Sequence, residues 1–360
     1  MAKWVPSGEL DFDLRPRTGA ASGGAFTRES DSVVAVTIAA PARRAGSLSG
    51  AAREDMLVGY LFVLPTLLIL GTFLIWPIVQ TFWMSLYNWD LLSQERTFRG
   101  LQNYRLLLDD ADFWLALRNT VYYSVGVVPT QTILALLVAL AANQRIRGRT
   151  FFRSAYYFPS ISSSIVVALL FMWILQGGGL ADWLLSLTGV TPPRPAWLSN
   201  PNGILELLVQ PLGWSLPEWA IGPSIALLSV MMLNIWSTIG SMMIIFLAGL
   251  QDIPRDVYEA ASVDGANSRQ AFWSITLPLL RPVTLFVVIV GVIGTFQVFD
   301  QIWMMTKGTA GTTTMVYKIY SESFGGGFRA GSAAAMTAVL FAIIFVVTML
   351  QLRFFGRREA

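Results

Sequence analysis

Two short polar segments interrupt the long apolar runs of this sequence. Residues 234–237 read NIWS, and residues 296–301 read FQVFDQ. Solutes rich in hydroxyl groups bind through hydrogen bonds and aromatic faces, and these segments offer both. An ionisable side chain within a membrane span is functional by default, so Asp300 leads the candidates, although helix capping or bonding to a neighbouring helix is an alternative role. The candidate solute-binding residues are Asn234, Trp236, Ser237, Phe296, Gln297 and Asp300.

The composition explains why such segments stand out. Of 360 residues, 54% are hydrophobic and only 13% are charged, whereas soluble domains carry about 25% charged residues. The chain is therefore expected to be an integral membrane protein. It has no cysteine, which excludes disulfides, zinc–thiolate sites and thiol nucleophiles. It also has no histidine, the commonest metal ligand and the usual general base. These absences argue against an enzyme, although carboxylate chemistry stays open.

Six apolar runs are long enough to cross a membrane, which takes about 20 residues. The sequence therefore predicts an all-α membrane protein, a six-helix bundle with kinks at its internal prolines. Residues 53–360 form this transmembrane domain. Residues 1–52 are polar, rich in glycine and serine, and predicted to be a disordered tail. The predicted spans are 57–87, 116–142, 151–175, 223–247, 283–305 and 333–355.

Basic residues set the expected orientation, because cytoplasmic loops carry an excess of lysine and arginine. Arginines crowd the loop between the second and third spans, the C-terminus and the approach to the first span, whereas lysine occurs only at Lys3, Lys307 and Lys318. Both termini are therefore predicted to be cytoplasmic. Residues 177–222 become an extracytoplasmic loop, with a short helix at GILELLV. This loop is either a packed cap or a docking surface.

The stretch between the fourth and fifth spans is unexpectedly polar. It predicts a helix beginning at Pro254 and ending before Gly265, which suits the left-handed position after a helix. Asn267 or Ser268 then caps a second helix, which is expected to end at Leu277 before a proline. A bland loop, a DNA-binding helix-turn-helix and a docking element for a cytoplasmic partner all fit the pattern. The membrane context and the few basic residues argue against DNA.

The sequence EAASVDGANSRQAFWSITLPLLRP, residues 259–282, closely resembles the EAA motif of permease subunits of ATP-binding-cassette (ABC) importers. The segments at 98–123, 151–175, 295–308 and 320–341 also resemble carbohydrate-type permeases, whose relatives import maltose or glycerol phosphate. One departure is TKGTAGTTT at 306–314, where the family often has T-x-G-G-P. The resemblance implies a coupling loop at 250–282. Its ATPase-coupling residues would be Glu259, Ala260, Ala261, Asp264, Gly265, Ala266 and Phe272.

The resemblance also implies a type I permease fold and a heteromeric complex in a bacterial inner membrane. The expected partners are a second homologous permease, two ABC ATPase subunits, an extracytoplasmic solute-binding protein or lipoprotein, and the lipid bilayer, with no nucleic acid. No Walker A pattern occurs in the chain, so ATP-Mg is expected on the partner subunits, with no cofactor or metal here. The implied cargo is a sugar, a di- or oligosaccharide.

Two alternatives for the transport function stay open. One is a permease for a glycerol-phosphate-like or other polar solute, although few basic residues lie within the spans. The other is a secondary carrier, which would also use kinked helices and polar residues near the middle of the membrane. A carrier needs an ion relay, and the spans hold almost no charge besides Asp300.

Overall fold

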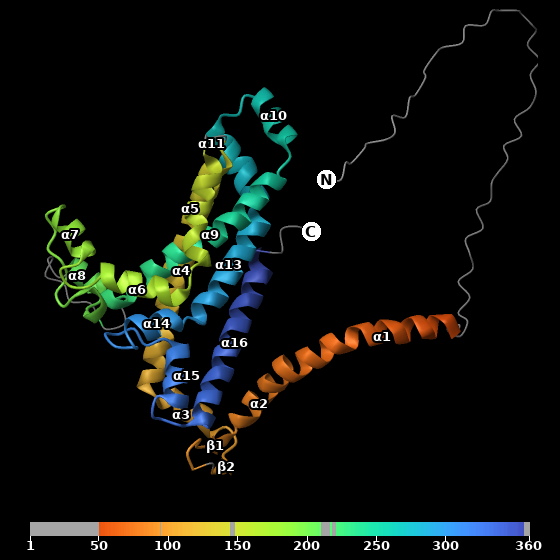
Figure 1. Ribbon diagram of the computed structural model, residues 1–360, viewed down its shortest axis with the longest axis vertical. Coiled ribbons are helices and arrows are strands. Elements are labelled where there is room, and N and C mark those ends of the chain that lie inside the picture. Colours follow the sequence, from red (N-terminus) through yellow and green to blue (C-terminus); the bar gives the residue numbers. More distant parts are fainter. Residues whose placement is uncertain (1–49, 94, 145–147, 210–216, 218–220, 356–360) are drawn as a thin grey trace, which may run out of the picture. The chain divides into compact units, whose positions relative to one another are not determined.

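The computed structural model describes residues 50–93, 95–144, 148–209, 217 and 221–355 (Figure 1). The predicted tail lies almost wholly outside these residues. The chain divides into two units, Met1–Val63 and Leu64–Ala360, and apart from the first part of α1 the features considered below lie in the second. The first long helix, α1 (Gly50–Leu70), continues through a π-helical turn at Gly71–Ile75 into α2 (Trp76–Met84).

Long apolar helices dominate the described residues, as predicted. Besides the span Met56–Met84, three single helices are long and apolar enough to cross a membrane: α4 (Ala111–Asn143), α9 (Ile225–Asp252) and α16 (Ala330–Phe355). Two bent pairs raise the count to six if each is one span. The first pair is α5 (Arg149–Ile161) with α6 (Ser164–Ile174), bent by 97°. The second, bent by 62°, comprises Ser268–Leu279 and α13 (Arg281–Phe296).

The predicted fifth span, 283–305, is wrong as a continuous helix. Helix α13 ends at Phe296, three residues follow, and α14 (Asp300–Met305) begins a separate short helix. The segment has neither proline nor glycine at this break, so no local signal marks it. A second unpredicted feature is an antiparallel hairpin of β1 (Tyr87–Trp89) and β2 (Arg96–Phe98).

Helices α4 and α9 form the centre of the bundle, with α13 packed on α4 and α5 packed on α9. The α5–α9 crossing is very close, because a Cβ added at Gly240 would collide with the Tyr156 carbonyl oxygen. At the same crossing the Ser160 hydroxyl donates to the Ser237 carbonyl oxygen (2.6 Å) and accepts from the Ser241 amide (3.1 Å). Small residues and hydroxyls at helix crossings are typical of membrane bundles, where they allow close packing.

The two ends of the bundle carry different structures (Figure 1). At one end lies the polar pair α10 (Arg255–Val263) and α11 (Ser268–Ala271). At the other lie the hairpin, α3 (Gln102–Asp109) and α15 (Met315–Phe324). The loop at 177–222 contains α7 (Leu180–Ser186), a 3-10 turn at Trp197–Ser199 and α8 (Ile204–Val209). Helix α8 confirms the short helix predicted at GILELLV.

Candidate functional site

The turn between α10 and α11 is fixed by hydrogen bonds within its own segment. Gly265 has φ +82°, a conformation that costs any residue with a Cβ about 1 kcal/mol or more. Its amide donates to the Ser262 carbonyl oxygen (3.1 Å), and the Ala266 amide donates to the Ala261 carbonyl oxygen (2.9 Å). This pair of bonds is the Schellman motif that ends helices at a glycine. The predicted role of Gly265 in stopping the first helix is confirmed.

Helix α11 begins with a capping box at Asn267. The Asn267 side chain accepts from the Gln270 amide (2.9 Å), and the Gln270 side chain accepts from the Asn267 amide (2.8 Å). Two backbone donors at the start of the helix are thereby satisfied. Helix α10 begins at Arg255 with Pro254 at its cap, one residue later than predicted.

The predicted end of the second helix at Leu277 is wrong. After α11 the chain forms a π-helical turn at Phe272–Thr276 and continues into α12 (Leu277–Leu279). The proline at 278 is tolerated because it lies in the first turn of α12, where its missing amide costs little. The Tyr258 hydroxyl lies 2.9 Å from the Thr276 hydroxyl oxygen, which ties α10 to the π-helical turn.

The predicted coupling residues lie together on this helix pair and the adjoining π-helical turn, and four of the seven are exposed. Glu259, Ala260, Asp264 and Gly265 are exposed; Ala261, Ala266 and Phe272 are half-buried. An open hollow of about 320 Å³ lies beside the turn, α11 and the π-helical turn, and is lined by Asp264, Gly265, Ala266, Gln270, Ala271, Ser274 and Ile275. Small side chains around such a hollow allow another protein surface to approach closely.

The break between α13 and α14 lies inside the apolar run 283–305, which the sequence predicts as the fifth span. Irregular backbone within a span is tolerated only where protein buries it or where it lines a water-filled cavity. Gln297 and Asp300 flank the break and are exposed in this chain. Polar groups in this position suit an aqueous pathway.

The helices α9 and α14, which carry four of the six candidate solute-binding residues, contribute to one buried cluster, whereas Phe296 packs in another. Leu233, next to Asn234, and Ile302, on α14 with Asp300, belong to the same buried cluster. Ser237 is half-buried on the same helix as Asn234. Trp236 is 41% exposed, with its ring 5.6 Å from that of Phe171. Phe296, in contrast, is 6% exposed and packs in a separate cluster with α4 and α16 residues.

A buried glutamine that the sequence analysis missed joins the central helices. Gln131 on α4 is 1% exposed, and its side-chain oxygen accepts from the Thr238 hydroxyl of α9 (2.7 Å). Its amide nitrogen would lie 2.6 Å from a Cβ added at Gly291 of α13. The available signal was a side-chain amide, one of two inside the apolar run 116–142.

A second missed feature is an ion-pair network around Lys318 on α15. Its ammonium lies 3.2 Å from a Glu322 carboxylate oxygen and 3.4 Å from one of Asp112, at the start of α4. Burial alone lowers the pKa of Lys318, but the hydrogen bond to Glu322 and the neighbouring acids outweigh it and raise the pKa above its ordinary value. Lys318 is therefore cationic at neutral pH and fastens α15 to α4. The rarity of lysine was the only signal for it in the sequence.

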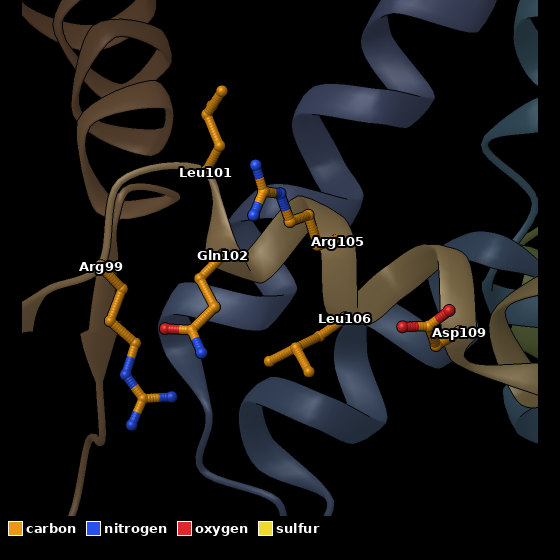
Figure 2. Close-up of a pocket in the computed structure, with 6 residues that line it drawn as sticks. All are labelled: Arg99, Leu101, Gln102, Arg105, Leu106 and Asp109. Carbon is orange, nitrogen blue, oxygen red and sulfur yellow. The ribbon is translucent and has the colours of Figure 1, made fainter.

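The surface hollow beside α3 has a different character (Figure 2). It measures about 530 Å³ and is lined by Arg99, Leu101, Gln102, Arg105, Leu106 and Asp109. Figure 2 shows the guanidinium groups of Arg99 and Arg105 pointing in different directions, so they do not converge on one point. Among the described residues, no group of three or more His, Cys, Asp or Glu side chains could hold a metal ion.

Comparison with known proteins places most of this chain in one family. Residues 131–359 match the family model described as "Binding-protein-dependent transport system inner membrane component". The trehalose/maltose transport system permease protein of Thermococcus litoralis is 33% identical over 305 residues, covering 83% of this chain and 95% of the relative. The lactose transport system permease protein of Rhizobium radiobacter is 32% identical over 306 residues, covering 84% and 94%.

A solved structure supports the fold. A chain in the crystal structure of a bacterial alginate ABC transporter, in complex with an alginate pentasaccharide-bound periplasmic protein, superposes with a TM-score of 0.67. It is 23% identical, and the match covers 85% of this chain and 96% of that one. The chain described here therefore belongs to the family of binding-protein-dependent transport system inner membrane components. It has the type I permease fold and is a transport subunit rather than an enzyme.

Proposed function

We propose that this chain is the permease subunit of an ABC importer that moves a sugar, a di- or oligosaccharide, into a bacterial cytoplasm. An extracytoplasmic binding protein delivers the sugar. Two partner ATPase subunits bind ATP-Mg, and a second homologous permease completes the pathway in the inner membrane. The sugar is supported by the names of the relatives, which transport trehalose, maltose or lactose.

The observation that carries this proposal is the exposed helix pair α10–α11. Its turn is held by the Gly265 motif and the Asn267 capping box. The helix pair is therefore an ordered projection rather than a flexible loop. Tyr258 links it to the π-helical turn, and α12 leads into α13. Movement of a docked ATPase would therefore be transmitted to α9 and α13 as a rigid-body displacement.

Uptake by the reconstituted complex tests the proposal. The chain is expressed with its neighbouring permease and ATPase genes, purified through a tag on this chain, and placed in vesicles with the binding protein. ATPase subunits should co-purify, and maltose, trehalose or lactose should accumulate only with ATP. Purification without any ATPase, or uptake driven by an ion gradient, would favour a secondary carrier. Uptake of glycerol 3-phosphate but of no sugar would move the cargo to phosphorylated polyols.

Sidedness is tested with single introduced cysteines, because the natural chain has none. Ser199 and Gln144 are both exposed in this chain. The predicted orientation places them on opposite sides of the membrane. An impermeant thiol reagent added to intact cells should label Ser199→Cys and spare Gln144→Cys. The reverse pattern would place both termini outside the cytoplasm.

A further inference from the structure

Four aromatic rings gather on α14 and α15, just beyond the broken end of α13. Phe299 and Trp303 contribute from the α14 side, and Tyr317 and Tyr320 from α15, with ring centroids 4.9–6.5 Å apart. We call these four residues the aromatic platform. Their sequence positions are spread over 22 residues on two separate elements, so only the fold reveals the group.

Three of the rings face in similar directions. The planes of Phe299 and Trp303 differ by 19°, those of Phe299 and Tyr317 by 27°, and those of Trp303 and Tyr317 by 37°. Offset stacking at these centroid distances is a preferred arrangement of aromatic pairs. Trp303 is 37% exposed, so the platform presents part of an indole to its surroundings.

The platform is held in place from two sides. The Tyr317 hydroxyl donates to the Lys307 carbonyl oxygen (2.6 Å), and the Tyr317 ring packs against Gly308, where φ is +69°. On the same helix, Lys318 pairs with Asp112 at the start of α4. These contacts fix α15 against both the 306–314 loop and α4, so the rings are ordered before any ligand arrives.

A carboxylate adjoins the platform. Asp300 and Trp303 are three residues apart on α14, and side chains at that spacing share a helix face. Asp300 is exposed and lies within the apolar run 283–305 that the sequence predicts as a span, and an exposed charge inside a span requires water. Aromatic rings that face lipid do not need a carboxylate beside them, whereas a sugar ring uses both: its apolar C–H face stacks on an aromatic ring and its hydroxyls bond to a carboxylate.

We propose that the aromatic platform is a sugar-binding station on the outer side of the broken span, with Trp303 stacking on one pyranose ring of the cargo. This inference rests on the proposed sugar-import function and extends it to a site beyond the polar residues of α9 and the end of α13. Asp300 would receive a hydrogen bond from a hydroxyl of the same sugar unit.

The test replaces Trp303 in the complete reconstituted complex, with maltose, trehalose and lactose as probes. An aromatic contact of about 0.5–1.5 kcal/mol corresponds to about a 2- to 12-fold change. Trp303→Ala should lower the uptake rate of the transported sugar by that factor, and Trp303→Phe should restore most of it. The matched control is Phe345→Ala, which removes a 53% exposed aromatic ring from α16, and its uptake should equal that of the unchanged chain.

Each outcome has one meaning. Uptake by Trp303→Ala equal to that of the control would overturn the platform while leaving sugar import intact. Loss of the second permease on purification of Trp303→Ala would also overturn it and make the rings a subunit contact. An unchanged complex that transports none of the three sugars would refute the proposed cargo, and the platform with it. A selective defect in Trp303→Ala, rescued by phenylalanine in a fully assembled complex, is the expected result.

Discussion

We call the helices α10 and α11 the coupling pair and the helices α13 and α14 the broken span. The chain joins the two regions through α13, yet different interactions stabilise their structures. In the coupling pair, the Gly265 turn and the Asn267 cap are made by residues three to five positions apart. Around the broken span, the hydrogen bonds join residues far apart in the sequence. Lys318 and Asp112 are 206 positions apart, and Thr238 and Gln131 are 107 apart. A rigid projection for an ATPase can be encoded locally, whereas a pathway between helices depends on distant parts of the chain arriving together.

The largest expected effect comes from breaking the local turn. Gly265→Asp places a Cβ at φ +82° and a charge on the face that would meet the ATPase. We expect ATP-driven uptake to fall to background and ATPase co-purification to weaken, while the amount of chain in the membrane stays unchanged. Gly100→Asp is the matched control, because Gly100 also has positive φ, and a Cβ at either glycine meets no atom within 4 Å. Normal uptake by Gly265→Asp would remove the coupling role.

The second-largest effect is expected at the candidate solute-binding residues. Asp300→Asn removes a charge but keeps the size of the side chain. A hydrogen bond to a charged group contributes about 1.5–3 kcal/mol, so uptake should fall by about 10- to 100-fold with the complex intact. Asn234→Ala should act in the same direction by about 2- to 12-fold, as loss of a neutral hydrogen bond would. Both are read from initial uptake rates in vesicles.

The control for this pathway test is Asp109→Asn, which changes an exposed carboxylate on α3 and should leave uptake unaltered. If Asp300→Asn instead prevents the permease and ATPase subunits from co-purifying, Asp300 has a structural role. The pathway would then be limited to the α9 residues and the aromatic platform, and the broken span would be a packing feature.

These two regions also differ in how far the sequence predicts them. The Gly265 turn and the Asn267 cap are local signals, and both predictions are confirmed. The break after Phe296 was missed, because residues 283–305 read as one apolar run and the helix end depends on how α14 packs against α6 and α9. Similarly, the stop at Leu277 was wrong because the π-helical turn at Phe272–Thr276 lets the helix continue past a proline.

Side-chain groups assembled from distant elements were beyond sequence reasoning altogether. Nothing in the order of residues indicates that Trp303 and Tyr320 lie 4.9 Å apart, or that Lys318 has acids on α4 as neighbours. The six candidate solute-binding residues were chosen by residue type and resemblance. Their roles stay predictions, and the buried position of Phe296 shows that residue type alone does not fix orientation.

A smaller effect is expected when the long-range network is cut. Lys318→Met removes the cation from Glu322, Asp110 and Asp112. The loss should be about 1–2 kcal/mol, because Arg329 still pairs with Glu322 and Asp112 is largely exposed. We expect a lower melting temperature in detergent. The control is Lys307→Met. Lys307 is the only other lysine among the described residues, and it forms no ion pair with any of them.

The pH dependence of this difference has a definite sign. The folded-state pKa of Lys318 is raised, so its stabilising contribution is complete below the unfolded pKa of about 10.4. It is lost only as pH rises through the folded value. The difference in melting temperature between the unchanged chain and Lys318→Met should therefore be constant from about pH 6 to pH 9. A difference that shrinks across this range would mean that Lys318 is not held as a cation.

The smallest effect is expected at the capping box. Asn267→Ala removes the acceptor for the Gln270 amide, which should cost about 0.5–1 kcal/mol of local stability. Because the Gly265 turn remains, α10 should keep its end and only the start of α11 should loosen. Hydrogen exchange read by mass spectrometry on a peptide covering 266–276 should therefore speed up by about 2- to 5-fold, with uptake only slightly reduced. Asn267→Ser keeps a capping oxygen and should restore protection. If Asn267→Ala instead altered exchange in α14 or α15, the coupling pair would not be the locally encoded unit that its hydrogen bonds describe.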